Sequence, residues 1–224
     1  MKISFVPGWI AACAIGFGLG FPAHILLEQL AGGVEFRTTM YAVFGPVQDG
    51  VAMVVPLRDS FYRGSLLGLL AFGTILGIAQ SIALRGRLQR MGPWVLAGAA
   101  GFLAICILAV WPLHAAIGWG KIAGPVEPIV ITLGGGSFVG VLQWLYLRKL
   151  GFRASRWLGR WTGGLAVGLL IAMPLFIFLE DVLGVLIPWG PSLAILGVLL
   201  GSVAGAMSRQ ALFEALDSRQ VEAR

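Results

Sequence analysis

The hydrophobic pattern of the chain consists of long apolar runs separated by short segments that hold most of the charged residues. A helix needs about 20 apolar residues to cross a hydrocarbon layer of about 30 Å, because it rises about 1.5 Å per residue. Runs of this length lie at about residues 9–30, 65–84, 94–113, 129–147, 161–179 and 190–208. The pattern therefore predicts an all-α integral membrane protein, a six-transmembrane-helix bundle forming a single polytopic membrane domain over residues 1–224.

The composition supports this class. Of the 224 residues, 58% are hydrophobic and only 12% are charged, whereas soluble domains carry about 25% charged residues. The N-terminal segment resembles a secretory signal, with Lys2 ahead of an apolar stretch, but we interpret it as the first span. The net charge of +6 does not indicate nucleic-acid binding, because the cations cluster at the ends of the runs.

The distribution of cations predicts the orientation. The N-terminus, the 85–93 and 148–160 segments and the tail after residue 208 hold 12 of the 16 Lys and Arg residues. Cytoplasmic loops carry such an excess of cations. We therefore expect both termini to be cytoplasmic and the protein to reside in a bacterial cytoplasmic (inner) membrane.

Residues 31–64 form the longest segment between two runs, and we expect them to be an outer loop. Gly45-Pro46 and Asp49-Gly50 favour turns there, while the residues between the turns are largely apolar. A short hairpin and an interfacial helix both fit this pattern. Because long ordered connections are often functional, this loop is a candidate partner surface.

A small-residue stripe recurs in the even-numbered runs. Gly73, Gly77 and Gln80 share one helix face, and the fourth run repeats the same spacing 63 residues later. The members of the two full copies and of a weaker third copy are Gly73, Gly77, Gln80, Leu84; Gly136, Gly140, Gln143, Leu147; and Gly201, Gly205, Ser208, Leu212. Trp94 and Gly101 also match Trp161 and Gly168 in spacing. The spacing therefore predicts repeated helical hairpins, that is, three tandem helix pairs in which the partner helix of the first pair has diverged in sequence.

Two interpretations of the stripes remain open. Glycines four residues apart let another helix backbone approach closely, which is a main source of helix association in lipid. The alternative is a broken helix that lines a substrate path, with Gly134-Gly135-Gly136 as the break. Gln80 and Gln143 are candidate pins between helix pairs through interhelical hydrogen bonds, or ligands for a polar head group.

One passage resembles a known protein family. Gly140-x-x-Gln143-Trp144-x-x-Leu147-Arg148 is similar to the repeated G-x-x-Q-W-x-x-L-R signature of small bacterial multi-pass membrane proteins of uncharacterised activity. The copy that starts at Gly77 has Ser81 in place of the tryptophan. The resemblance implies a membrane location and a repeated-hairpin fold, and it implies no catalytic residues.

Ionisable residues within a span are functional candidates by default. His24 and Glu28 lie four apart on the first span and share a face, and His114 and Glu127 are on the same side of the membrane. These four residues are candidates for a ligand or proton site, although a structural His–Glu hydrogen bond is the simpler explanation of the first pair. No metal-binding motif is present, so we predict no metal.

The basic segment and the tryptophans indicate interfaces. Five cations, Arg148, Lys149, Arg153, Arg156 and Arg160, are candidates for contact with anionic lipid head groups or for docking a partner. The eight tryptophans fall near the ends of the runs, where an aromatic belt at the lipid–water interface would place them.

The sequence specifies no catalytic residues and no cofactor. It favours a non-enzymatic accessory or structural subunit that packs against other membrane proteins, a second copy of itself or lipids, and that binds no nucleic acid. The alternatives are a small transporter or channel with a glycine-broken helix at the midplane, and an outward-facing enzyme that uses His24 and Glu28.

Overall fold

The computed structural model describes residues 5–31, 58–88, 90–113, 129–152, 154–183 and 189–222. Within these ranges the chain is helical, and it contains six helices that are long and apolar enough to cross a membrane. The elements are α1 (Phe5–Ala31), α3 (Arg58–Ala83), α4 (Gly92–Ile105), the π-helix η1 (Cys106–Val110), the π-helix η2 (Val130–Gly135), α7 (Gly136–Lys149), α8 (Trp157–Leu183) and α9 (Trp189–Glu222). These findings are consistent with a multi-pass membrane protein.

Several boundaries differ from those predicted. Helix α3 begins at Arg58, so the end of the predicted 31–64 loop is helical, while residues 32–57 lie outside the described residues. Helix α1 begins at Phe5, earlier than the predicted residue 9, and it continues past Pro22. Helix α9 runs without a break to Glu222, and the tail therefore extends the sixth span instead of forming a separate helix. Its continuation is stabilised by burial of Ala211, Leu212, Ala215 and Leu216.

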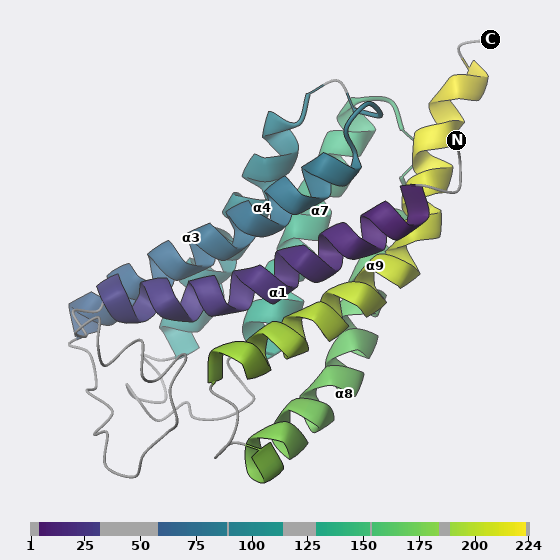
Figure 1. The fold of residues 1–224 in the computed structure, drawn as a ribbon. Coiled ribbons are helices and arrows are strands. Elements are labelled where there is room, and N and C mark those ends of the chain that lie inside the picture. The colour runs from purple at the N-terminus through teal and green to yellow at the C-terminus, as the bar shows by residue number, and fades with distance from the viewer. Residues whose placement is uncertain are drawn as a thin grey trace.

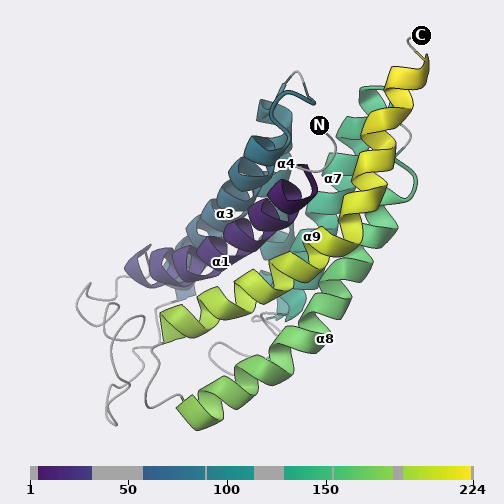
Figure 2. The same ribbon diagram turned by 45° about the vertical axis from the view of Figure 1, so that its right-hand side comes forward.

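The six helices form a closed ring. Each helix packs against its neighbours in the order α1, α3, α4, α7, α8 and α9, and α9 packs against α1 to complete the ring. Figures 1 and 2 show α1 lying between α3 and α9 in both views. The first and last spans are therefore partners, although they are the most distant in sequence.

The two turns that carry arginines lie at the same end of the ring, next to the C-terminal part of α9 (Figure 1). Each turn requires a glycine with positive φ, Gly86 at +85° and Gly151 at +82°, a conformation that a side chain disfavours. After α7 the Phe152 N–H donates to the Leu147 carbonyl at 3.0 Å and the Gly151 N–H to the Arg148 carbonyl at 2.9 Å. This pattern is a Schellman motif, and it ends the helix.

Aromatic side chains fill the centre of the ring. The Phe72 ring stacks on Phe102 with centroids 4.4 Å apart, and it meets Phe17 edge-on at 5.5 Å. All three side chains are fully buried, and they come from α3, α4 and α1. In lipid there is no hydrophobic driving force between helices, so these three rings stabilise the contact among α1, α3 and α4 by van der Waals packing. The stacked and edge-on arrangements are the favourable geometries for aromatic pairs.

Candidate functional site

The most concentrated polar chemistry inside the ring lies near the basic end. Gln80 and Gln143 are both fully buried, and the Gln143 Nε2 donates to the Gln80 Oε1 at 2.7 Å. The Trp94 Nε1 donates to the same oxygen at 3.1 Å, and the Gln80 Nε2 donates to the Cys13 Sγ at 3.7 Å. We call the set Trp9, Cys13, Gln80, Trp94, Gln143, Trp157 and Ser208 the polar layer.

The two glutamines therefore bond directly to each other across α3 and α7. The sequence predicts each glutamine as a pin that forms a hydrogen bond between helix pairs. Gln80 is the centre of the network because its oxygen accepts two hydrogen bonds and its amide donates a third. The third copy of the stripe supplies Ser208, whose hydroxyl accepts a hydrogen bond from the Trp9 Nε1 at 3.2 Å and donates to the Ala204 carbonyl at 2.7 Å.

Three tryptophans of the polar layer meet at the centre of the ring. The ring centroids of Trp9, Trp94 and Trp157 lie 6.4, 5.7 and 6.2 Å apart pairwise, and all three side chains are fully buried. Trp161 is fully buried as well and stacks on Trp157 at 5.5 Å. The predicted assignment of these four residues to an aromatic belt is wrong, because belt residues face the lipid–water interface, whereas these face one another.

The glycine stripes lie against other helices. A Cβ atom added at Gly73 would collide with the backbone of Gly98, and one at Gly77 would lie 2.8 Å from the Val95 Cα, so α3 and α4 touch along their backbones. On α9, a Cβ at Gly205 would lie 3.1 Å from the Ile10 Cα of α1. On α7, Cβ atoms at Gly136 and Gly140 would instead meet side chains of α8.

The segment Gly134-Gly135-Gly136 is not interrupted. It lies where η2 passes into α7, and Gly135 and Gly136 keep helical dihedral angles near φ −60°. Cβ atoms added at the three glycines would meet the side chains of Ile105, Phe102 and Leu165. The helix changes from π to α geometry here while its glycines stay packed against apolar neighbours.

The predicted outer site is only partly within the described residues. His24 is 3% exposed and packs against α3, because a Cβ added at Gly68 would collide with its imidazole and carbonyl. His114 and Glu127 lie outside the described residues, as does the side chain of Glu28. Within the described part of the chain, no three His, Cys, Asp or Glu residues are grouped so that they could hold a metal.

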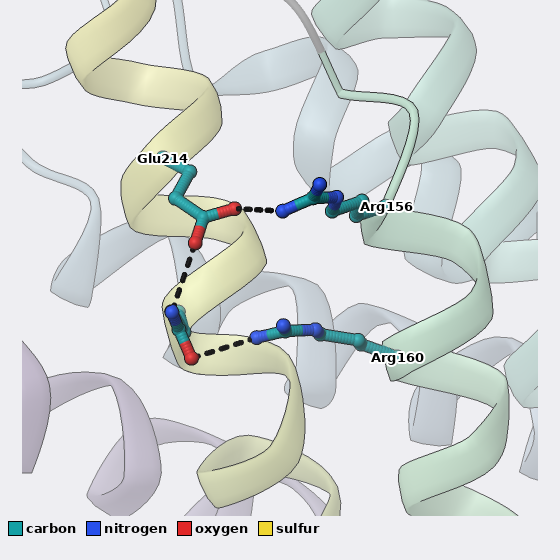
Figure 3. Close-up of polar contacts among 4 residues, drawn as sticks. Arg156, Arg160 and Glu214 are labelled. Carbon is teal, nitrogen blue, oxygen red and sulfur yellow. Dashed lines mark hydrogen bonds and ion pairs between the residues drawn. The ribbon is translucent and has the colours of Figure 1, made fainter.

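The five predicted basic residues occupy different environments. Figure 3 shows Arg156, just before α8, and Arg160 of α8 reaching α9. Arg156 lies 3.7 Å from the Glu214 carboxylate and Arg160 donates to Gln210 at 2.9 Å. Arg148 lies over the Trp144 ring at 4.9 Å and, like Lys149, is exposed. Arg153 lies outside the described residues. Of these five residues, Arg148 and Lys149 at the end of α7 are therefore the described cations with no contact to α9.

Sequence reasoning missed Trp9, Cys13 and Trp157 as parts of the polar layer. A signal was present, since Trp9 with Gly16 and Trp157 with Gly164 repeat the seven-residue spacing of Trp94 with Gly101. Cβ atoms at these three glycines would meet Leu76, Ala204 and Val139, which hold equivalent places in the three stripes. In the tertiary structure the residue of α8 that is equivalent to Trp94 is thus Trp157, and not Trp161 as the sequence spacing suggests.

No protein-family model, no curated protein and no solved structure matches the chain.

Proposed function

We propose that this chain is a non-enzymatic integral membrane protein of a bacterial cytoplasmic membrane that serves as an accessory or structural subunit. In this proposal both termini are cytoplasmic and the outer half of α8 binds a helix of another membrane protein. The proposal is supported by the location of the cations and by the surface of α8.

The cations favour a cytoplasmic location for the end of the ring that holds the turns. The described cations of this end are Arg85, Arg87, Arg90, Arg148, Lys149, Arg156, Arg160 and Arg209, against Glu214 as the acid whose contacts are described there. An excess of cations is typical of cytoplasmic loops, and anionic head groups attract them. Arg148 and Lys149 are the residues of this set that we expect to contact lipid head groups or a cytoplasmic partner.

The observation that carries the proposal is the outer half of α8. Pro174 has no N–H, so the carbonyl of Leu170 loses its usual partner within the helix. Leu170 is 75% exposed and Pro174 is also exposed. A carbonyl without a donor is costly in hydrocarbon, so a donor from a neighbouring helix would stabilise this face.

A second proline provides a comparison within the same molecule. Pro22 frees the carbonyl of Gly18 in the same way, but Gly18 is buried against α9, where its added Cβ would meet Val198. The carbonyl that Pro22 leaves free in α1 is thus covered by another helix of this chain, whereas the carbonyl that Pro174 leaves free in α8 lies on an exposed face. This difference favours a partner at α8 over a bundle surrounded only by lipid.

The test is crosslinking in native membranes. We expect a photo-crosslinking residue at Phe178, which is 57% exposed on α8, to form a discrete protein adduct. The matched control is Leu67 of α3, which is 45% exposed on a helix without a proline and should yield lipid adducts alone. If both positions yield lipid alone and the extracted protein has the mass of one chain, the proposal is wrong.

A small transporter or channel is the second candidate, because η1 and η2 face each other in the outer half of the ring. π-Helical segments are frequent at functional sites, and the fully buried Thr132 hydroxyl in η2 has no hydrogen-bond partner among the described residues. Labelling of a Thr132→Cys variant in a cysteine-free background by a membrane-impermeant thiol reagent would favour this candidate. Protection of that cysteine in opened membrane vesicles, where the reagent reaches both faces and labels an Arg90→Cys control fully, would count against it.

A further inference from the structure

Two atoms of the polar layer form an unmatched donor and acceptor. The Gln143 Oε1 and the Trp157 Nε1 are buried and have no hydrogen-bond partner within the described part of the chain. Both side chains are fully buried. We propose that one water molecule bridges them, accepting the hydrogen bond of the indole and donating one to the amide oxygen.

The orientation of the Gln143 amide follows from its neighbours. An indole N–H only donates, so the Trp94 Nε1 requires the oxygen of Gln80 to face it. The Gln143 amide must then present its nitrogen to that same oxygen, because two amide oxygens would repel each other. Its own oxygen is consequently directed away from Gln80, and exchanging the oxygen and nitrogen of either amide would break a bond.

The other two helix pairs show what the third pair lacks. At equivalent places in the stripes, the Trp94 indole bonds Gln80 directly at 3.1 Å, and the Trp9 indole bonds Ser208 directly at 3.2 Å. In the third helix pair, α7 with α8, the residues at the equivalent places are Gln143 and Trp157. Its donor and acceptor are the same chemical groups as in the first pair, yet they do not bond.

The reason is the distance between α7 and α8. Trp161 occupies the place that Gly98 has on α4 and Cys13 has on α1, four residues after the tryptophan of each pair. The Trp161 Nε1 donates to the Gly136 carbonyl at 2.7 Å, so the indole lies between the two helices. Consistent with this, the Cβ position at Gly140 meets the side chains of Trp161 and Leu158 at 2.5 and 3.2 Å, where Gly77 meets a backbone atom of α4.

Water is the molecule that matches this donor and this acceptor. It both donates and accepts, whereas an amide or a carbonyl cannot serve both atoms at a single point. Buried waters typically bind polar groups that the protein leaves unsatisfied. The site is close to the basic end, because Gln143 precedes Arg148 by about 7.5 Å along the helix axis and Trp157 follows the exposed Arg156. Water therefore has a short route to it.

The experiment is proton-detected NMR of the full chain in lipid bilayers with labelled tryptophan. The Trp157→Phe variant identifies the indole resonance of Trp157. We expect that resonance to show a cross-peak to water, and the Trp94 and Trp9 indoles, which bond side chains directly, to show none at the same mixing time. An absent cross-peak at Trp157, or equal cross-peaks at all three indoles, would overturn the proposal.

Two variants separate the bridge from simple water access. In Gln143→Met the acceptor is lost, and we expect the Trp157 cross-peak to fall at least threefold; an unchanged cross-peak would overturn the bridge. In Trp161→Cys, which copies the residue of α1, we expect α7 and α8 to close so that Trp157 bonds Gln143 directly and loses the cross-peak. Gln210→Met, at an exposed bond on α9, is the matched control and should leave the cross-peak unchanged.

Discussion

Two contacts between sequence neighbours, α3 with α4 and α7 with α8, are built from the same stripe but pack differently. At the first contact, Gly73 and Gly98 bring the two backbones together. At the second, Trp161 lies between the helices and bonds the Gly136 carbonyl. The comparison teaches that a glycine stripe permits close approach, while the residue facing it decides whether the approach occurs.

The largest effect should come from adding a methyl group to the close contact. Gly73→Ala places a Cβ against the Gly98 carbonyl, which is backbone and cannot rotate away. We expect the free energy of unfolding to fall by about 3 kcal/mol. Gly140→Ala should cost less, about 1.5 kcal/mol, because the obstructing atoms belong to the side chains of Trp161 and Leu158, although the bond of Trp161 to Gly136 restrains its indole. Reversible unfolding in mixed micelles measures both, and equal losses would contradict the comparison.

The next largest effect should be the difference between the losses of unfolding free energy caused by substituting Gln80 and Gln143. Gln80→Leu leaves the Trp94 indole and the Gln143 amide without an acceptor, and we expect a loss of about 2 kcal/mol. Gln143→Leu removes one bond while the Gln80 oxygen keeps Trp94, so a loss of about 0.6 kcal/mol is expected. The same unfolding measurement applies, and a larger loss for Gln143→Leu would mean that Gln80 is not the centre of the network.

A smaller difference in stability loss is expected between substitutions of two buried tryptophans, Trp94 and Trp157. Trp94→Phe and Trp157→Phe remove similar volume from the same cluster, but only Trp94 loses a direct bond to a side chain. We expect Trp94→Phe to cost about 0.6 kcal/mol more than Trp157→Phe. Thermal unfolding followed by tryptophan fluorescence compares the two, and Trp9→Phe, which also loses a direct bond, should behave like Trp94→Phe.

The smallest effect belongs to the contact between α8 and α9 at the basic end. Arg156→Gln removes an ion pair whose side chains are 73% and 40% exposed. Exposed pairs are weak and are screened by salt, so a loss of about 0.3 kcal/mol is expected. The loss should disappear in high salt, and an effect that persists there would point to packing by the arginine stem.

The resemblance between the two contacts was visible in the sequence, but the difference was not. The 63-residue repeat placed Gln80 and Gln143 at equivalent positions, and the structure joins them by a hydrogen bond. Spacing along a helix gives depth and face, yet it does not say which helix covers that face. For this reason the tryptophans near the span ends suggested an interfacial belt, whereas Trp9, Trp94 and Trp157 face the axis of the ring.

The sequence by itself determined that the chain has six apolar helices, because a backbone in hydrocarbon must bond internally and a helix of about 20 residues is the shortest element that does so. It did not determine where every helix ends, because α3 begins at Arg58 and α9 continues to Glu222, so charged residues extend both helices beyond their apolar runs. Only the tertiary structure decided that α9 returns to α1 and closes the ring, and that Trp161 lies between α7 and α8. Both outcomes depend on side-chain volumes that meet across different helices, which local periodicity does not encode.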